Sequence, residues 1–197
     1  MIDTYTSLHV HSEYSSALLG FTDSIIHIKD ALNWCYEHGL RGMSISDHEG
    51  CSGFVEMEQV INKMNLERPF QHIFANEIYL LSEQENELKN DPIKRPHYWH
   101  FLLNCLDEEG VHMLYELSSR AWLRSYVYRG LRRRPTFYSD IEEIVGNNQG
   151  HIIGSSACLG GYLPHLILNL LVGVLRLLAK VISFLSANLA LRTTKNS

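Results

Sequence analysis

Strand-like and helix-like segments alternate along most of this chain, and no other feature constrains its fold as strongly. Short runs in which apolar and polar residues alternate predict strands over residues 4–10, 42–46, 70–80, 98–106 and 150–155. Apolar residues at helical spacing predict helices over residues 25–37, 52–64, 108–122 and 139–145, and Asp107 is expected to cap the third of them. The polar run 82–94 is predicted to be a surface loop. This order predicts an α/β fold with a mainly parallel sheet.

Length, charge and cysteine content narrow the functional classes. The 197 residues are enough for one domain with a full hydrophobic core. The net charge is −5, so nucleic acid could be bound only through a local basic patch. The 4 cysteines have no paired spacing, and the N-terminus lacks a basic stretch followed by an apolar run. We therefore expect no disulfide framework, no signal peptide and a reducing, cytoplasmic location.

The first predicted strand ends in two histidines, His9 and His11. Because successive side chains of a strand point to opposite faces, these two imidazoles point the same way. Paired imidazoles at a strand end can hold a divalent metal ion. Two ordinary polar histidines at a strand end are an equally tenable interpretation of the pair by itself. Donors at the other strand ends therefore decide between the two interpretations.

Metal-competent residues recur at the other predicted strands. In parallel α/β barrels the functional side chains gather at the carboxyl ends of the strands. The donors at these positions, or beside the fourth strand, are Asp47, His48, Glu77, His97, His100 and Cys158. A mixture of imidazoles, carboxylates and one thiolate fits a polynuclear Zn, Mn or Fe site better than a closed structural zinc site. Clustered divalent ions activate water and hold a phosphate, so the pattern indicates phosphoester hydrolysis.

Several segments resemble, in order, the successive motifs of the PHP (polymerase and histidinol phosphatase) domain. They are HVHSEYS (9–15), ISDHE (45–49), NEIY (76–79), HFLL with DEEG (100–103 and 107–110) and SSACLGG (155–161). The version at the N-terminus of bacterial replicative DNA polymerase III alpha subunits is the most similar one. The segment LSSRAW (117–122) and the Arg-rich stretch up to residue 136 also resemble that subunit, particularly forms from Gram-positive bacteria and their phages. The resemblance covers about residues 5–164.

This resemblance implies a distorted (β/α)7 barrel with a metal cluster on one rim. Family members hold up to three divalent ions; we expect fewer in this chain, with Zn, Mn or Fe as the candidates. No catalytic residue is implied beyond the metal ligands. Carried over by position, the ligands would be His9, His11, Asp23, His48, Glu77, His100 and Cys158. Asp47 would orient His48 without binding the metal itself, and His97 would be a surface residue. Asp23 has a competing interpretation, because Asp23 or Ser24 could cap the helix predicted from residue 25.

The resemblance also implies a function in DNA replication. Family members that keep their ligands can hydrolyse phosphoesters, and this activity is associated with 3′→5′ proofreading; in others the domain is a structural platform. The implied partners are DNA and either other replicase subunits or the remainder of the polymerase. An arginine cluster could contact phosphates, although a solvated helix face is the commoner meaning of such a charge run. The arginines are Arg124, Arg129, Arg132, Arg133 and Arg134.

The chain departs from the family pattern in two respects. The pattern closes with an Asp-x-His motif on a later strand, and no such motif follows Cys158. Palm, fingers and thumb regions are also missing, so this chain cannot polymerise DNA by itself. We therefore expect an N-terminal fragment whose barrel is incomplete at its C-terminal end. Two alternatives stay open: a free-standing metal-dependent phosphoesterase acting on a small phosphate monoester, and an inactive platform or interaction remnant.

The C-terminal part differs in composition from the rest. Between residues 166 and 191 the only charges are Arg176 and Lys180, among many Leu, Ile and Val. We divide the chain into a PHP domain, residues 1–164, and an apolar helical tail, residues 165–197. Two cations in the middle of a span nearly cancel the gain from its aliphatic residues in a bilayer. A helix packed on protein, or one left with an exposed, sticky apolar surface by truncation, is therefore favoured over membrane association.

Overall fold

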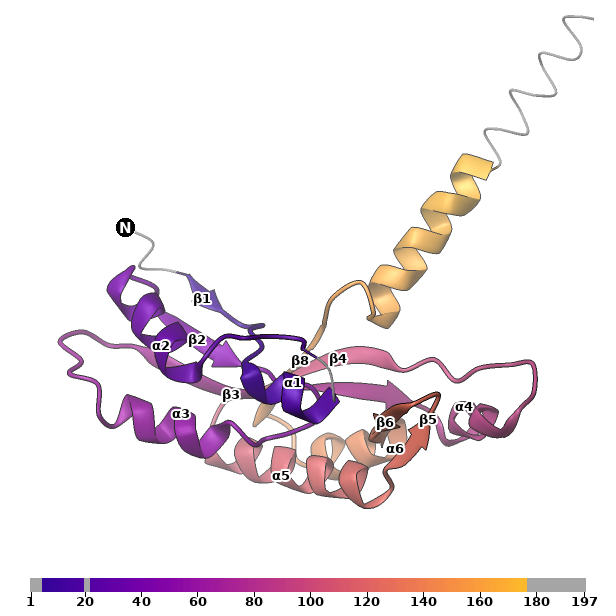
Figure 1. Ribbon diagram of the computed structural model, residues 1–197, viewed down its shortest axis with the longest axis horizontal. Coiled ribbons are helices and arrows are strands. Elements are labelled where there is room, and N and C mark those ends of the chain that lie inside the picture. Colours follow the sequence, from indigo (N-terminus) through magenta and orange to yellow (C-terminus); the bar gives the residue numbers. More distant parts are fainter. Residues whose placement is uncertain (1–4, 20–21, 177–197) are drawn as a thin grey trace, which may run out of the picture.

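The computed structural model describes residues 5–19 and 22–176, and a curled six-stranded sheet lies at its centre (Figure 1). The order is β1-β2-β3-β4-β8, and β7 pairs with the second half of β3. The strands are β1 (Thr6–Ser7), β2 (Gly42–Ile45), β3 (Gln71–Leu81), β4 (Trp99–Cys105), β7 (Pro135–Phe137) and β8 (Ile152–Ser156). Within the described part of the chain the sheet stays open, with β1 and β8 at its two ends, so the expectation of an incomplete barrel is confirmed.

Strand directions are mixed. The pairs β1–β2, β2–β3 and β3–β7 are parallel, whereas β4 runs antiparallel to both β3 and β8. The prediction of a mainly parallel sheet is therefore correct for the first three strands and wrong for β4. The reason is the connection 82–98, which turns back at the end of the sheet where β3 stops. Such a return needs no crossover helix, and it produces an antiparallel neighbour.

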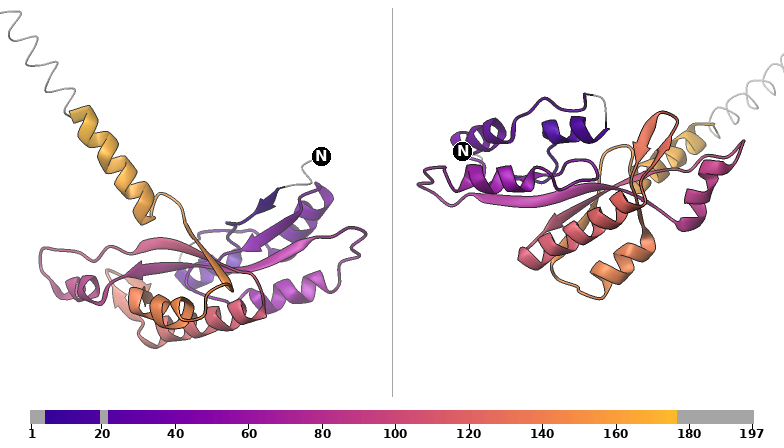
Figure 2. Two further views of the ribbon diagram at one scale, coloured as in Figure 1. Left: turned by 180° about the vertical axis from the view of Figure 1, so that it is seen from behind. Right: turned by 60° about the horizontal axis from the view of Figure 1, so that its bottom comes forward.

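Helices cover the sheet in two groups, as the views in Figures 1 and 2 show. The longer helices that pack on the sheet are α2 (Ile28–Glu37), α3 (Phe54–Ile61) and α5 (Glu108–Leu123). Ile28 and Leu32 of α2 are fully buried with Met57 of α3 and Met43 of β2. The apolar face of α5 packs against β3 and β4 in a second cluster. The apolar faces of these helices thus pack on the sheet and hold in position the strands that carry the candidate ligands.

Several local expectations are confirmed and others are wrong. Asp107 caps α5, because its carboxylate accepts a hydrogen bond from the Gly110 N–H at 3.0 Å. A helix missed from the sequence, α1 (Glu13–Leu19), directly follows the two N-terminal histidines. The helix expected over 139–145 is a short α6 (Tyr138–Ile141) that continues as a π-helix (Glu142–Gly146). These differences change the ends of elements but not their order.

The Arg-rich stretch contains a hairpin that the sequence reading missed. Strands β5 (Tyr126–Tyr128) and β6 (Leu131–Arg133) pair antiparallel around the turn residues Arg129 and Gly130. Both turn residues have positive φ, at 52° and 79°, which is the conformation of a type I′ turn. Glycine tolerates this conformation, and its place between two short alternating runs is the signal that could have predicted the hairpin.

The segment predicted as a surface loop holds a short helix, α4 (Glu83–Glu87), followed by a 3₁₀ turn (Leu88–Asn90). Ser82 begins the helix with a capping box: its hydroxyl accepts from the Glu85 N–H, and the Glu85 carboxylate accepts from the Ser82 N–H. We expect Ser82→Ala to lower the free energy of unfolding by about 1 kcal/mol, as measured by urea denaturation. A variant as stable as the wild type would show that this cap does not stabilise α4.

A helix over residues 162–176 leaves the sheet and points away from it (Figure 2). From Leu166 to Arg176 every side chain of the described part is exposed. None of the described helices is both long and apolar enough to cross a membrane. The remaining tail, residues 177–197, lies outside the described residues, and the domain division at residue 164 stays a prediction.

Candidate metal centre

Glu77 of β3 is the centre of the cluster. Its side chain is buried, and its carboxylate faces four imidazoles from three other parts of the chain. Glu77 Oε2 lies 3.1 Å from His9 Nε2 and 2.9 Å from His11 Nε2. The same oxygen lies 3.5 Å from His48 Nδ1, and Glu77 Oε1 lies 2.8 Å from His100 Nδ1. A buried carboxylate with this many imidazole neighbours is well placed to share cations with them.

Backbone pairing explains why these residues meet. The segment after β2 continues alongside β3, where Glu77 N–H donates to the Asp47 carbonyl and Glu49 N–H donates to the Glu77 carbonyl. This places His48 beside Glu77. His100 lies diagonally across from Glu77 on the antiparallel strand β4, within the reach of a long side chain. The residue is therefore at the start of its strand, not at the carboxyl end that the barrel rule predicts.

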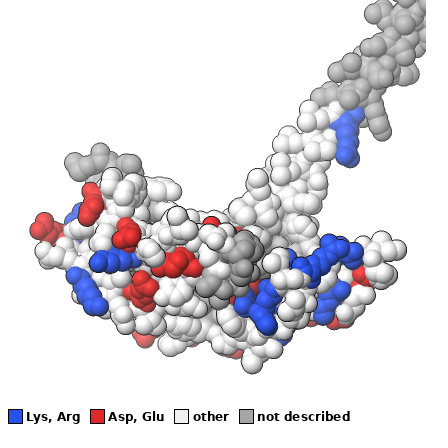
Figure 3. All heavy atoms as spheres, in the orientation of Figure 1, with Lys and Arg blue, Asp and Glu red and all other residues white. Residues whose placement is uncertain are grey.

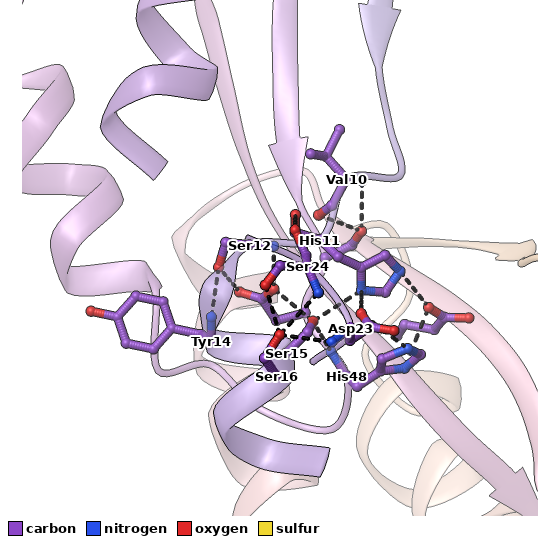
Figure 4. A network of polar contacts seen from close by, with 12 residues as sticks. Val10, His11, Ser12, Tyr14, Ser15, Ser16, Asp23, Ser24 and His48 are labelled. Carbon is purple, nitrogen blue, oxygen red and sulfur yellow. Dashed lines mark hydrogen bonds and ion pairs between the residues drawn. The ribbon is translucent and has the colours of Figure 1, made fainter. Parts of the chain in front are cut away.

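Asp23 faces the ring nitrogens of His11 and His48 that do not face Glu77 (Figure 4). Its Oδ2 lies 3.7 Å from His11 Nδ1 and 3.8 Å from His48 Nε2, and the His11 and His48 rings are 4.4 Å apart. Its backbone N–H donates to the Ser16 hydroxyl at 2.8 Å. Since α2 begins at Ile28 with His27 in the capping position, the interpretation of Asp23 as a helix cap is wrong.

Cys158 completes the set from the segment after β8. Its Sγ lies 3.3 Å from His100 Nδ1 and 3.9 Å from Glu77 Oε1, and it accepts from the Gly160 N–H. A Cβ on Gly160 would lie 2.9 Å from the His100 ring, so only glycine lets the two segments approach this closely. The structure thus brings together all seven residues that the resemblance implied as ligands. His97 instead packs its ring on Trp99, at 3.6 Å.

The donor spacing fits divalent cations. Three overlapping groups have all their ligand atoms within 4.8 Å of one another. The members are His9, His11 and Glu77; His11, Asp23 and His48; and His48, Glu77 and His100. Two ligands of one ion at about 90° lie about 3 Å apart, and the atoms of the first group are 2.9–3.1 Å apart. Imidazole and carboxylate together suit Zn, Mn and Fe.

The protonation states of His48 and Glu77 also fit a metal site. Burial lowers the pKa of His48 to about 4, despite the nearby Glu77 carboxylate, so this imidazole is neutral at pH 7. Burial alone would raise the pKa of Glu77, but its side-chain contacts with the imidazoles of His100, His11 and His9 outweigh this effect and hold the pKa well below its usual range. Neutral imidazole and ionised carboxylate are the forms that bind metal ions.

Asp47 supports a different histidine from the one expected. Its carboxylate accepts from the Ser12 N–H, the Ser12 hydroxyl and the Ser15 hydroxyl at 2.7–2.8 Å, and Ser15 in turn contacts His11. The carboxylate therefore supports the turn that carries His11, whereas the sequence prediction assigned it to His48. Ser12 and Ser15 were missed, because nothing in the sequence distinguishes these serines from ordinary turn residues.

The five arginines that were predicted as candidates for phosphate contact have different surroundings. Arg124 forms an ion pair with Asp140, and Arg134 is buried against Glu49 and the Trp122 ring. Arg129 and Arg132 are exposed on the β5–β6 hairpin. The Arg133 guanidinium lies 4.5 Å from the centre of the Tyr98 ring and 5.9 Å from that of Tyr79. Figure 3 shows Lys and Arg side chains gathered at the end of the molecule that carries the hairpin and α4. Phosphate contact by these residues stays a prediction.

Thiol alkylation tests the assignment of Cys158. In metal-free protein at about pH 8, iodoacetamide should modify Cys158 first, because it is exposed. Burial raises the pKa of both Cys51 and Cys105 to about 12, which keeps these thiols unreactive. Adding Zn²⁺ beforehand should slow modification of Cys158 about tenfold or more, as followed by peptide mass spectrometry. Equal rates with and without zinc would contradict a role as ligand.

Comparison with known proteins gives the same assignment as the motifs. The PHP domain family matches residues 7–191. Over 159 residues, the chain is 33% identical to DNA polymerase YorL of Bacillus subtilis strain 168 and to a DNA-directed DNA polymerase of Bacillus phage SPbeta. Each of these matches covers 77% of this chain and 12% of the relative. The DNA polymerase III subunit alpha of Borreliella burgdorferi is 26% identical over 164 residues, which are 83% of this chain and 13% of that protein.

A solved structure is a more distant match. It is a protein described as a metal-dependent phosphoesterase from Bifidobacterium adolescentis, with a TM-score of 0.36 and 17% identity, covering 60% of this chain and 35% of the other. The chain spans only 12–13% of the length of the polymerases it matches. The motifs of this chain, their order and the family match over residues 7–191 all indicate the same family. The chain belongs to the PHP domain family.

Proposed function

We propose that this chain is the PHP domain of a DNA polymerase of the III alpha type, and that its cluster binds divalent metal ions and hydrolyses phosphodiester bonds in 3′→5′ proofreading. The observation that carries the proposal is the buried carboxylate of Glu77 facing four imidazoles. A surface carboxylate needs no such arrangement, and a structural ion pair needs only one partner. A replicative role would also place the protein in the cytoplasm.

The chain's own residues would divide the work as follows. Glu77, Asp23 and the imidazoles of His9, His11, His48 and His100 would hold the ions. Divalent cations held there supply Lewis-acid chemistry toward a phosphoester. Cys158 would bind as a thiolate ligand and not act as a nucleophile, because its Sγ faces His100 Nδ1 and Glu77 within the cluster.

Arg133 supports a nucleic acid as the substrate over a small monoester. Its guanidinium stacks on Tyr98 and approaches Tyr79, whose ring centre is only 4.7 Å from that of His100. A cation that is separated from the cluster by a single side chain can contact a neighbouring phosphate of a polynucleotide. Aromatic rings beside it can stack on the bases of that polynucleotide. Among the predicted arginines, Arg124 and Arg134 have carboxylate neighbours inside the protein, so contact with DNA falls to Arg129, Arg132 and Arg133.

Hydrolysis of a 5′-labelled single-stranded oligonucleotide with added Mn²⁺ tests the proposal. We expect shortened products with wild type and none with His9→Ala/His11→Ala. Arg133→Ala should raise KM for DNA about fivefold or more while leaving hydrolysis of p-nitrophenyl phosphate unchanged, because it loses a phosphate contact but no ligand. Arg68→Ala is the matched control, since Arg68 also stacks on a tyrosine, Tyr36, but belongs to a different part of the protein.

The outcomes separate the candidate functions. Cleavage of the monoester with no effect of Arg133→Ala on DNA would favour the free-standing phosphoesterase. No hydrolysis by metal-loaded protein would favour the platform role, in which the domain serves the rest of a polymerase or another replicase subunit. DNA and those subunits are the partners that the proposal implies.

A further inference from the structure

We infer that Ser15, held by Asp47, fixes the orientation and tautomer of His11, so that His11 offers the lone pair of Nε2 to a cation. This positioning role rests on the metal function proposed above. Figure 4 shows the Ser15 side chain between His11 and His48. Ser15 contacts His11 Nδ1, whereas Glu77 faces the other ring nitrogen, Nε2.

Two backbone groups decide where the protons of this network lie. The Ser12 N–H can only donate, and it donates to Asp47 Oδ1 at 2.7 Å. The His48 N–H can only donate as well, and it donates to Ser15 Oγ at 3.1 Å. A carboxylate only accepts, so Asp47 receives the hydroxyl protons of Ser12 and Ser15, at 2.7 and 2.8 Å. The hydroxyl proton of Ser15 is therefore directed to Asp47.

His11 takes the remaining position on Ser15. The Ser15 oxygen has two lone pairs, and one of them accepts from the His48 N–H. His11 Nδ1 lies 3.0 Å from this oxygen, which has no proton left to give, so Nδ1 must donate. A neutral His11 then carries its proton on Nδ1. Its Nε2, which lies 2.9 Å from Glu77 Oε2, keeps a lone pair that faces the predicted cation.

Burial makes this arrangement rigid. Ser12 and Ser15 are 0% exposed and Asp47 is 2% exposed, so water cannot replace their hydrogen bonds. Because one hydroxyl contacts both the His11 ring and the His48 backbone, it also sets the spacing of two candidate ligands. His100 uses the opposite ring nitrogen, since its Nδ1 faces Glu77. With cations bound, the cluster would therefore contain histidines of both tautomers, and Ser15 would select the one for His11.

Zinc titration against Ser15→Ala tests this role. We expect the variant to bind Zn²⁺ about 10–100-fold more weakly than wild type, in competition with a chromophoric chelator. Ser44→Ala is the matched control, because Ser44 is equally buried but its hydroxyl has no hydrogen-bond partner among the described residues. It should bind zinc within about twofold of wild type, since it makes no contact with the network. Circular dichroism spectra confirm that each variant is folded.

A second measurement needs only the wild type. In the zinc-loaded protein, long-range ¹H–¹⁵N spectra should show His11 protonated at Nδ1, with slow solvent exchange, and His100 protonated at Nε2. Ser15→Ala should speed exchange of the His11 proton about tenfold or more. If the variant does not fold, a His11 protonated at Nε2, or a rapidly exchanging Nδ1 proton, in wild type overturns the inference.

The possible failures are distinguishable. Unchanged zinc affinity and unchanged exchange in Ser15→Ala would overturn the positioning role and leave the metal function intact. Wild-type protein that binds no zinc, manganese or iron would overturn the proposed function and the positioning role together. Equal losses in Ser15→Ala and Ser44→Ala would also overturn the role, because they would reflect a general effect of changing a buried serine.

Discussion

Glu77→Gln is expected to weaken the binding of divalent metal more than 100-fold, because one buried carboxylate contacts all four imidazoles of the cluster. Loss of a residue that only supports a ligand typically costs about 10–100-fold, and loss of a shared anionic ligand should cost more. The amide keeps the size of the side chain but removes its charge. Titration with Zn²⁺ or Mn²⁺, followed by calorimetry, measures the effect directly.

Glu58→Gln is the matched control for this change. Glu58 also faces an imidazole, with its Oε2 3.3 Å from His72 Nε2, but it is an exposed residue on α3 outside the cluster. The control should bind metal as the wild type does. If Glu77→Gln binds as tightly as Glu58→Gln, the four imidazoles do not share ions through Glu77.

Glu49→Ala should have the largest effect on stability, about 3–5 kcal/mol of free energy of unfolding. Glu49 and Arg134 are both almost fully buried, and Arg134 Nη1 lies 3.7 Å from Glu49 Oε2. Burial raises the pKa of Glu49, and the Arg134 guanidinium opposes that rise. Glu49→Ala removes this carboxylate from beside the buried Arg134 guanidinium. The same loop carries His48, so the loss should also weaken metal binding.

Urea denaturation of Glu49→Ala and Glu143→Ala measures this contribution. Glu143 forms an ion pair with Arg120 at 2.7 Å, but it lies on the surface, where solvent screens the interaction. Its loss should therefore change stability little. A cost for Glu49→Ala no larger than for Glu143→Ala would show that the buried pair does not stabilise this loop. Residue 49 has a positive φ of 52°, and glutamate and alanine both carry a Cβ, so this conformation strains the wild type and the variant alike.

Local patterns predicted most of the elements but not their directions. The helix α5 could be predicted to its first residue, because Asp107 has the cap chemistry and the apolar spacing follows it. The antiparallel direction of β4 could not, because direction depends on how the connection 82–98 returns to the sheet. Propensity and periodicity report on neighbours in sequence, whereas strand pairing is decided by distant residues.

The same holds for the site: its ligands could be predicted from the sequence, but the residues that support them could not. Histidines, Glu77 and Cys158 could be picked out because their motifs occur in a recognisable order, and the fold brings them together. The supporting residues Ser12 and Ser15 could not, because serine has many ordinary uses and their role depends on contacts with Asp47, more than 30 positions away. The capping role expected of Asp23 was wrong for a related reason, since α2 begins later than its pattern suggests.

Metal content tests the central claim most directly. The protein should be purified without chelator and analysed by plasma mass spectrometry beside His9→Ala/His11→Ala. Because the donors form overlapping groups that share Glu77 and His48, we expect about two or more equivalents of Zn, Mn or Fe per chain, and a large loss in the double variant. Substoichiometric metal in the wild type, equal to that in the variant, would contradict a functional metal centre.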